Sequence, residues 1–450
     1  MMTALLLVLS GCSTVQTTGQ TSSLTRGAAG IDVASASVQS DARGSAVQRN
    51  FAPVAGPANT LSGAVAAALN YNAAVREAST RSELSDIEVD IARSGYLPVV
   101  QGAAEVGQDG VPDWQVTLRQ PLFDWGRTGA QVDQAQATNS AAGFELMAAR
   151  EQAAFEAAQA YIGVKRSEAL VEAARENLAA YRRLTQLAKD RVQGGIGDNS
   201  EVELAGVHEG EAQAALEDAL GVLRNARIMF EARMGYTPQN LAPIPNLPLA
   251  LGDIADIRAA AMRSPAVAAA MARGEAANHA IEAERANLLP TLSLEGFART
   301  ETPLFGDRSV NTGVGIKLTS PTLAGFSNFQ RVEAADLAAN EVRWTAEKSI
   351  RDAMQQVQAY QAQAPGLRNR ANILEEQLER AMALRVLYED QFKFGDRGVS
   401  DLSAVLADVY RVDVSIINAR HDIFELQYAA AGSLGLLQES LAAVEGPRHP

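Results

Sequence analysis

The sequence predicts a mainly α-helical protein with a small β part, organised as a tandem repeat of one helix, two strands and a long helical hairpin. Three observations predict this fold class. Some helical segments are far longer than those of globular domains, short runs alternate apolar and polar residues, and matching glycines and prolines recur 200 residues apart. Each repeat is therefore expected to be a complete structural unit.

The composition excludes several classes of function. The 450 residues carry 53 acidic and 39 basic side chains, a net charge of -14, so we expect no nucleic-acid partner. One cysteine and four scattered histidines offer no internal disulfide and no metal-ligand spacing. Phosphate-binding, nucleophile-elbow and zinc-protease motifs do not occur, so we expect no enzyme, no catalytic residue, no metal and no cofactor.

The N-terminal segment predicts export and lipid modification. Residues 4–9 form an apolar run that is shorter than the ~20 residues of a transmembrane helix and is typical of a signal peptide. The run leads into LSGC, which resembles a bacterial lipobox and implies acylation of Cys12; the alternative is an incidental thiol in a leader. No Lys or Arg precedes the run, and an upstream translation start would explain that departure. We expect a signal peptide at 1–11 and a flexible, lipid-tethered arm at 12–58.

The first repeat is expected at 59–235 and opens with a helix. Asn59 or Thr60 is a suitable N-cap, and Gly95 and Pro98 end the helical pattern. Two strand-like runs follow.

The run WQVTLRQPL has the period of a strand. It alternates Val116 and Leu118 with Gln115, Thr117 and Arg119. This pattern predicts one apolar face and one polar face.

A long helical hairpin completes the repeat. From about Gly129 to Arg191 the pattern is helical, and ~60 residues at 1.5 Å each make a rod of roughly 90 Å. The stretch QGGIGDNS at 193–200 breaks this rod, and a second long helix returns to Gly235.

The same order then recurs. A proline-rich linker is expected at 236–252, a second repeat at 253–437 and a C-terminal tail at 438–450. The expected elements of the second repeat are a helix ending at Pro290, strands within 291–301 and 312–321, a long helix from near Ser327 that Pro365 and Gly366 interrupt, and a last helix to about Leu437.

Corresponding positions of the two repeats share residue types. Four pairs of residues lie 200 positions apart, and each pair marks the same place in both repeats. In order, these places are the end of a strand, the break of the hairpin, the start of the return helix and the end of the return helix. The pairs are Pro121 and Pro321, Gly195 and Gly395, Ser200 and Ser400, and Gly235 and Gly435.

The strands have the length of membrane-barrel strands, about 10 residues each. Four strands cannot close a barrel, and open edges in lipid leave backbone groups unpaired, so several chains must pool their strands. Three copies give twelve. Trp114 and Trp125 flank the first alternating run, as aromatic residues at a membrane interface would. A soluble sheet with edge tryptophans is the alternative, and the long rods, which suit the wall of a tube, favour the barrel.

The ordered set of features resembles the TolC family of outer-membrane channels over roughly residues 59–440. The set includes the lipobox, the entry YLP…LRQPLFDWGR into a long helix, the repeat, and the ending FKFGDRGVSDLSAVLADVYRVDVSIINARHDIFELQYAAAGSLG. The resemblance implies a homotrimer with a 12-stranded outer-membrane β-barrel continued by a 12-helix periplasmic α-barrel. It also implies a lipid-anchored protein of the cell outer membrane that extends into the periplasm.

The resemblance further implies an export channel. Its partners would be a periplasmic adaptor (membrane fusion protein), an inner-membrane ABC or proton-driven transporter and outer-membrane lipid. The last helix favours type I protein secretion over small-molecule efflux. The alternative function is a lipid-anchored periplasmic coiled-coil scaffold or adaptor without a pore, although adaptors usually have one helical hairpin and this chain has two.

The family closes its tunnel at the tips of the hairpins, here QGGIGDNSE and FGDRGVSD. The resemblance assigns an adaptor-contact role to Gly195, Ile196 and Gly395, and Asp401 matches an acid of the periplasmic aperture, with Glu201 and Glu203 as candidates from the first tip. The alternatives are glycines that only make the turn and acids on a solvated helix face. Where the best-studied member has a second aspartate, this chain has Ala404, so a double acidic ring is not implied.

Overall fold

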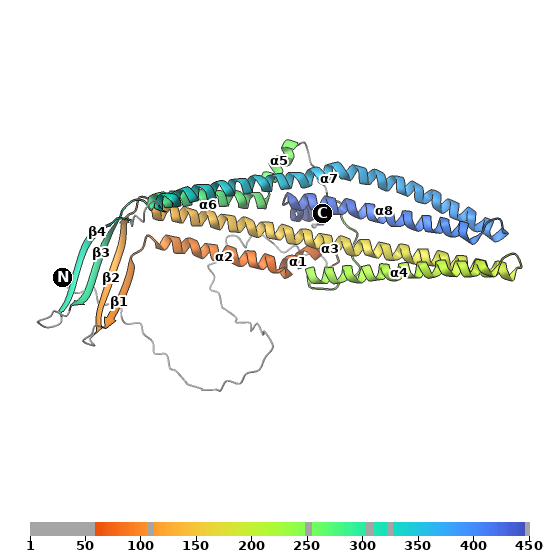
Figure 1. Cartoon of the computed structure of the whole chain (residues 1–450), viewed down its shortest axis with the longest axis horizontal. Helices are drawn as coiled ribbons and strands as arrows, with labels where there is room; N and C mark the ends of the chain where they lie inside the picture. Colours follow the sequence, from red (N-terminus) through yellow and green to blue (C-terminus); the bar gives the residue numbers. More distant parts are fainter. Residues whose placement is uncertain (1–58, 107–111, 248–253, 302–308, 322–326, 446–450) are drawn as a thin grey trace, which may run out of the picture. The chain divides into compact units, whose positions relative to one another are not determined.

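The computed structural model describes residues 59–106, 112–247, 254–301, 309–321 and 327–445. The predicted signal peptide and arm, with Cys12, lie outside the described residues. The elements in order are α1 (Leu61–Tyr71), α2 (Ala73–Ser94), β1 (Val99–Val106), β2 (Pro112–Phe123), α3 (Arg127–Gln193), α4 (Asn199–Met234), α5 (Ile254–Met262), α6 (Pro265–Ala286), β3 (Thr291–Glu301), β4 (Ser309–Thr319), α7 (Ser327–Phe394), α8 (Val399–Ser433) and α9 (Leu437–Glu445) (Figure 1).

The long helices α3 and α7 are the frame of the structure. Next to the sheet, α3 packs between α2 and α6, and α7 packs on α6. Toward the hairpin ends, α3 packs between α4 and α8, and α7 packs on α8 (Figure 1). The helices therefore form a layer one helix thick, in which α3 and α7 run through both halves.

Small side chains form the seams of this layer. The buried residues of α3 are dominated by alanine, among them Ala154, Ala157 and Ala158. Alanine has the highest helix propensity and lets neighbouring helix backbones approach closely. A strongly alanine-rich sequence therefore suits long helices that pack side by side over a great length.

The main hydrophobic core lies midway along α3. The buried rings of Tyr161, Phe230 and Tyr428 come from α3, α4 and α8. The Tyr161 hydroxyl donates to the carbonyls of Asn59 at 3.0 Å and Ala242 at 2.7 Å. These bonds fasten both the start of the first repeat and the linker to the helical layer.

The predicted helix after Asn59 is divided in the structure. Thr60 is the N-cap, as predicted, and its Oγ1 accepts from the Gly63 amide at 3.2 Å. The helix ends at Tyr71 because Asn72 adopts an extended conformation and caps α2, accepting from the Ala74 amide at 2.8 Å. Asparagine side chains favour such local backbone bonds, and the period of the apolar residues does not reveal the break.

The prediction that Pro365 and Gly366 interrupt the second long helix was wrong. The helix α7 is continuous from Ser327 to Phe394 with Pro365 inside it. A proline removes one backbone hydrogen bond of many, while the adjacent Tyr360 and Ala364 pack against Ala430 of α8. Tertiary packing therefore outweighs the local propensity.

The last helix also differs from the prediction. The helix α8 ends at Ser433, not near Leu437, because Gly435 turns the chain with φ 70°. The short helix α9 then begins at Leu437.

Backbone conformation confirms the repeat. Gly195, Gly235, Gly395 and Gly435 all adopt the left-handed conformation, with φ between 70° and 87°. At Gly235 a Cβ would also lie 2.8 Å from the ring of Tyr71. The residue type that recurs every 200 positions is the one that these turns require.

The two repeats contribute equally to one antiparallel sheet with the order β1-β2-β3-β4. The pairing of Val116 with Ala298 joins β2 of the first repeat to β3 of the second. The outer edges of β1 and β4 have no partner strand among the described residues. Within the same ranges, every helix lacks an apolar stretch long enough to span a membrane.

Candidate functional site

The two hairpin tips are built from backbone hydrogen bonds around a left-handed glycine. Tip 1 comprises residues 194–198 and tip 2 comprises residues 395–398. In tip 1 the amides of Ile196 and Gly197 donate to the Arg191 carbonyl at 3.0 and 3.2 Å. The carboxylate of Asp198 then caps α4 by accepting from the Ser200 amide at 3.0 Å.

Arg191 joins the two tips. Its side chain is 9% exposed, and Nη1 lies 3.3 Å from Glu201 Oε2. Nη1 also donates to the Arg397 carbonyl of tip 2 at 3.4 Å, and the guanidinium lies 4.4 Å from the centre of the buried Phe392 ring. We call Arg191, Glu201, Phe392 and the Arg397 carbonyl the tip latch.

An apolar cluster supports the latch from behind. Leu184 and Ala188 of α3 pack with Phe392 of α7 and Leu402 of α8. The hydroxyl of Tyr181 donates to the Ser403 carbonyl at 3.0 Å in the buried seam between α3 and α8. The tips of the two repeats are therefore held as one unit within the chain.

Asp401, at the start of α8, lies outside this buried cluster. Its carboxylate accepts from the Gly398 amide at 3.4 Å and lies 3.8 Å from Arg397 Nη1. The Asp401 side chain is half exposed, and the Arg397 guanidinium also covers the Tyr388 ring at 4.5 Å. A carboxylate at the third helical position also complements the positive end of the α8 dipole.

The other predicted tip residues occupy different environments. Glu203 is exposed, whereas the carboxylate of Glu201 is mostly covered and neutralised by Arg191. Ile196 is 61% exposed and projects from tip 1 beside Gly395. Of the three predicted acids, Glu203 and Asp401 are therefore exposed, and Glu201 forms an ion pair within the chain.

The sheet has one apolar and one polar face, as predicted. Opposed residues such as Leu118 and Val100, or Ile316 and Leu294, fall on one face, and Val314 on the same face is 78% exposed. The opposite face carries the ion pair of Lys317 and Glu295 at 2.9 Å.

Phe297 explains why the third strand alternates imperfectly. It lies on the polar face, where its ring covers Gly313 of β4 so closely that a Cβ there would be 2.7 Å away. The Arg299 guanidinium lies 5.5 Å from the centre of the ring. The aromatic residue therefore fills the space that a glycine leaves.

Trp114 and Trp125 lie at opposite ends of β2. Trp114 is on the apolar face near one end of the strand, and Trp125 follows the other end. Trp125 Nε1 donates to the Pro290 carbonyl at 2.8 Å, and its ring contacts Phe123 edge-on at 5.0 Å between centroids. At ~3.3 Å per residue the two rings are separated by roughly the thickness of a hydrocarbon layer.

Buried titratable groups that the sequence analysis missed lie along the helices. Burial raises the pKa of Asp413 in α8, and the nearby Glu176 adds to the rise. Burial also raises the pKa of Glu151, although its carboxylate accepts from the Leu437 amide at 3.1 Å and from Gln438 Nε2 at 2.9 Å. Among the described residues no cluster of His, Cys, Asp or Glu is arranged to hold a metal ion.

A four-stranded sheet with one exposed apolar face, joined to two long helical hairpins, is the architecture of a membrane channel protein. The chain belongs to the outer membrane efflux protein family, whose pattern it matches at residues 64–235 and 257–432. It is an outer-membrane channel-tunnel for export across the periplasm and the outer membrane, as the resemblance predicted.

Individual relatives agree with this assignment. The outer membrane efflux protein BepC of Brucella suis is 25% identical over 401 residues, which cover 84% of this chain and 85% of BepC. The fold is shared with the outer membrane protein VceC of Vibrio cholerae, with a TM-score of 0.72, 18% identity and coverage of 83% of this chain and 96% of VceC. It is also shared with the open state of the Neisseria gonorrhoeae MtrE outer membrane channel, with a TM-score of 0.71, 21% identity and coverage of 84% and 89%.

We predict that Arg191→Gln loosens both tips. The change leaves Glu201 partly buried without its cation, and loss of such a charged contact costs about 2 kcal/mol. Amide hydrogen exchange at residues 192–201 and 395–401 should accelerate by roughly an order of magnitude or more. The matched control is Arg183→Gln, an exposed arginine of the same helix. Equal exchange rates in the two variants would show that the latch does not hold the tips.

Proposed function

We propose that three copies of this chain assemble into a closed twelve-stranded barrel continued by a twelve-helix tunnel. The observation that carries the proposal is the pair of open backbone edges, on β1 and β4, in a sheet with an exposed apolar face. Each edge presents N–H and C=O groups that lipid cannot satisfy. Pairing β4 of one copy with β1 of the next satisfies every edge only when the ring closes.

Three copies fit both layers of the structure. Each chain supplies four strands, so three supply twelve, an even number within the range of outer-membrane barrels. The helices α2, α3, α6 and α7 form the layer beside the sheet, and three such sets give twelve. A scaffold without a pore is not favoured, because it leaves both the apolar face and the two edges without a function.

We propose that the tips form the periplasmic end of the tunnel and dock an adaptor. An adaptor hairpin would meet Ile196, which is exposed, next to Gly195 and Gly395, whose missing side chains leave room for a close approach. The two proposed roles of the glycines are compatible, because the left-handed turn also exposes the aliphatic side chain beside it.

We further propose an inner-membrane transporter, ABC or proton-driven, as the energy source, since no motif for nucleotide hydrolysis occurs in this sequence. We propose type I protein secretion as the first function of the channel, because the end of the last long helix resembles the type I secretion branch of the family. Small-molecule efflux is the second.

The barrel proposal is tested by two adjacent residues of β4. Val314 lies at the centre of the strand on the apolar face, and Gly315 lies on the other face with open space around it. Val314→Arg should cost about 2–4 kcal/mol in lipid and abolish most of the heat-modifiable, SDS-resistant trimer. Gly315→Arg should assemble and conduct in planar bilayers. A wild-type chain that stays monomeric, or equal assembly of the two variants, would refute the barrel.

The aperture proposal is tested by charge changes at tip 2. Three Asp401 carboxylates in a trimer would attract cations, so Asp401→Asn should reduce the cation-to-anion permeability ratio by roughly twofold. Ala404→Asp, one turn along the exposed side of α8, should raise the ratio. The reversal potential in a salt gradient measures both changes. Asp133→Asn, an exposed acid of α3, is the control, and a shift equal to that of Asp401→Asn would contradict an aperture role.

We propose that residues 1–11 are removed, that Cys12 is acylated, and that residues 12–58 tether the lipid to the first repeat. Cells expressing the wild-type chain should incorporate labelled palmitate into it, and Cys12→Ser should not. The variant should mature or assemble less well but conduct normally once assembled, because the barrel itself holds the trimer in the membrane. Palmitate labelling of Cys12→Ser would disprove the anchor.

A further inference from the structure

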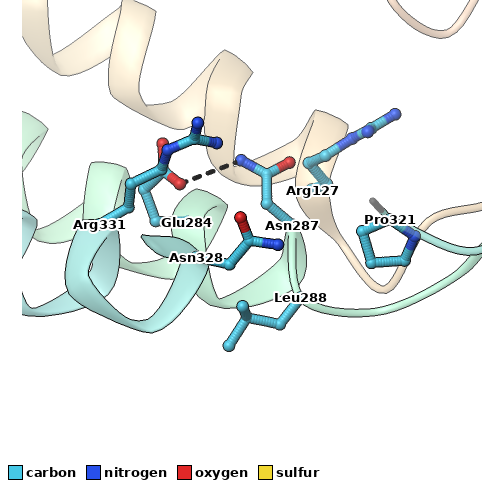
Figure 2. Close-up of a pocket in the computed structure, with 7 residues that line it drawn as sticks. All are labelled: Arg127, Glu284, Asn287, Leu288, Pro321, Asn328 and Arg331. Carbon is cyan, nitrogen blue, oxygen red and sulfur yellow. Dashed lines mark hydrogen bonds between the residues drawn. The ribbon is translucent and has the colours of Figure 1, made fainter. Parts of the chain in front are cut away.

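A charged pocket lies where the strands meet the helices. It has a volume of about 440 Å³ and is formed by the start of α3, the end of α6 and the start of α7 (Figure 2). The two repeats therefore build it together. Its lining residues are Arg127, Glu284, Asn287, Leu288, Pro321, Asn328 and Arg331.

The pocket carries two guanidinium groups and one carboxylate. Arg331 and Glu284 lie side by side at one side of the pocket, and Arg127 lies at the other side, beyond Asn287 (Figure 2). The Glu284 carboxylate accepts from Asn287 Nδ2 at 3.4 Å. The Nε of Arg127 is buried without a hydrogen-bond partner. A buried donor of this kind is costly unless a ligand satisfies it.

Asp124, an acid that precedes α3, already has hydrogen-bond partners. Asp124 contributes a charge near Arg127, but its carboxylate accepts from the Thr128 amide at 2.8 Å and from the Gly126 amide at 3.2 Å. The Asp124 carboxylate is thus occupied by the first turn of α3, and Asp124 does not line the pocket. The local balance inside the pocket is thus two positive charges and one negative charge.

In the barrel proposed above, the pocket would lie at the level of a membrane surface. Leu288 of the lining is two residues before Pro290, which receives the hydrogen bond of Trp125. Exposed apolar side chains occur at the same junction, among them Phe123, Leu289 and Phe329. Aromatic and apolar residues around a polar pocket are typical of the boundary between headgroups and acyl chains.

The position of α5 assigns the pocket to the outer side of the helical wall. Ala353 and Val357 of α7 pack against Ile257 and Ala261 of α5. An element inside the tunnel would obstruct it, so α5 lies outside. Arg331 precedes Ala353 by about six helical turns, so the two residues share one face of α7.

We propose that this pocket binds the headgroup of a membrane phospholipid, with its phosphodiester between Arg127 and Arg331 and its ammonium group on Glu284. The proposal rests on the barrel described above, which brings the pocket to the headgroup layer. Paired guanidinium groups match the phosphate oxygens, and the single carboxylate favours an ethanolamine headgroup over a glycerol headgroup.

The test uses the delipidated full-length trimer in detergent and native mass spectrometry. The probes are dihexanoyl phosphatidylethanolamine, dihexanoyl phosphatidylglycerol and inorganic phosphate. The Arg127→Gln/Arg331→Gln double variant should bind phosphatidylethanolamine about tenfold more weakly or worse. The matched control is Arg285→Gln, which removes the exposed arginine next to Glu284 that does not line the pocket, and it should bind as the wild type does.

A second variant tests the headgroup preference. Glu284→Gln should lose the preference for ethanolamine over glycerol headgroups while keeping affinity for the phosphodiester. Wild-type affinity in the double variant, or an equal loss in Arg285→Gln, would overturn the site. Inorganic phosphate that binds as tightly as the lipid would overturn the lipid assignment. Conductance of the same preparations reports the channel separately, so a conducting trimer without lipid selectivity refutes the pocket proposal alone.

Discussion

The unsatisfied edges of β1 and β4 are the constraint on which the rest of the structure depends. A four-stranded sheet leaves two rows of backbone donors and acceptors open, and the exposed apolar face beside them requires an apolar environment. A ring of several chains, as proposed above, would satisfy both requirements. Such a ring would also set the spacing of the helices that continue from the strands, and a layer one helix thick suits a wall around an open centre.

The helices meet this requirement through small residues and a few anchoring rings. Alanine seams, as at Ala154 and Ala157, allow close contact without a thick hydrophobic core. The exception is the middle of the layer, where Tyr161 and Tyr428 bind the carbonyls of the linker segment. That arrangement attaches α1, the linker and α9 to the long helices α3 and α8.

Elements that depend on local residue pattern could be predicted from the sequence. The boundaries of β3, the start of α7 and the turns at Gly195 and Gly395 follow from residue type and period. Prediction failed where side chains decide the outcome: Asn72 caps a helix that periodicity would continue, and packing carries α7 through Pro365. The same limit applies to the site. Arg191 has no sequence motif, and its role depends on Phe392 and Glu201, which come from other helices.

The tip latch also distinguishes motions within a chain from motions between chains. Arg191 of the first repeat binds the backbone of Arg397 in the second, and a shared apolar cluster supports the bond. Separating the two hairpins of one chain would therefore expose a partly buried ion pair and a buried aromatic ring. Within a trimer, displacement of whole subunits against one another leaves these contacts intact. The paired hairpins of one chain are therefore expected to move as one unit in the assembly proposed above.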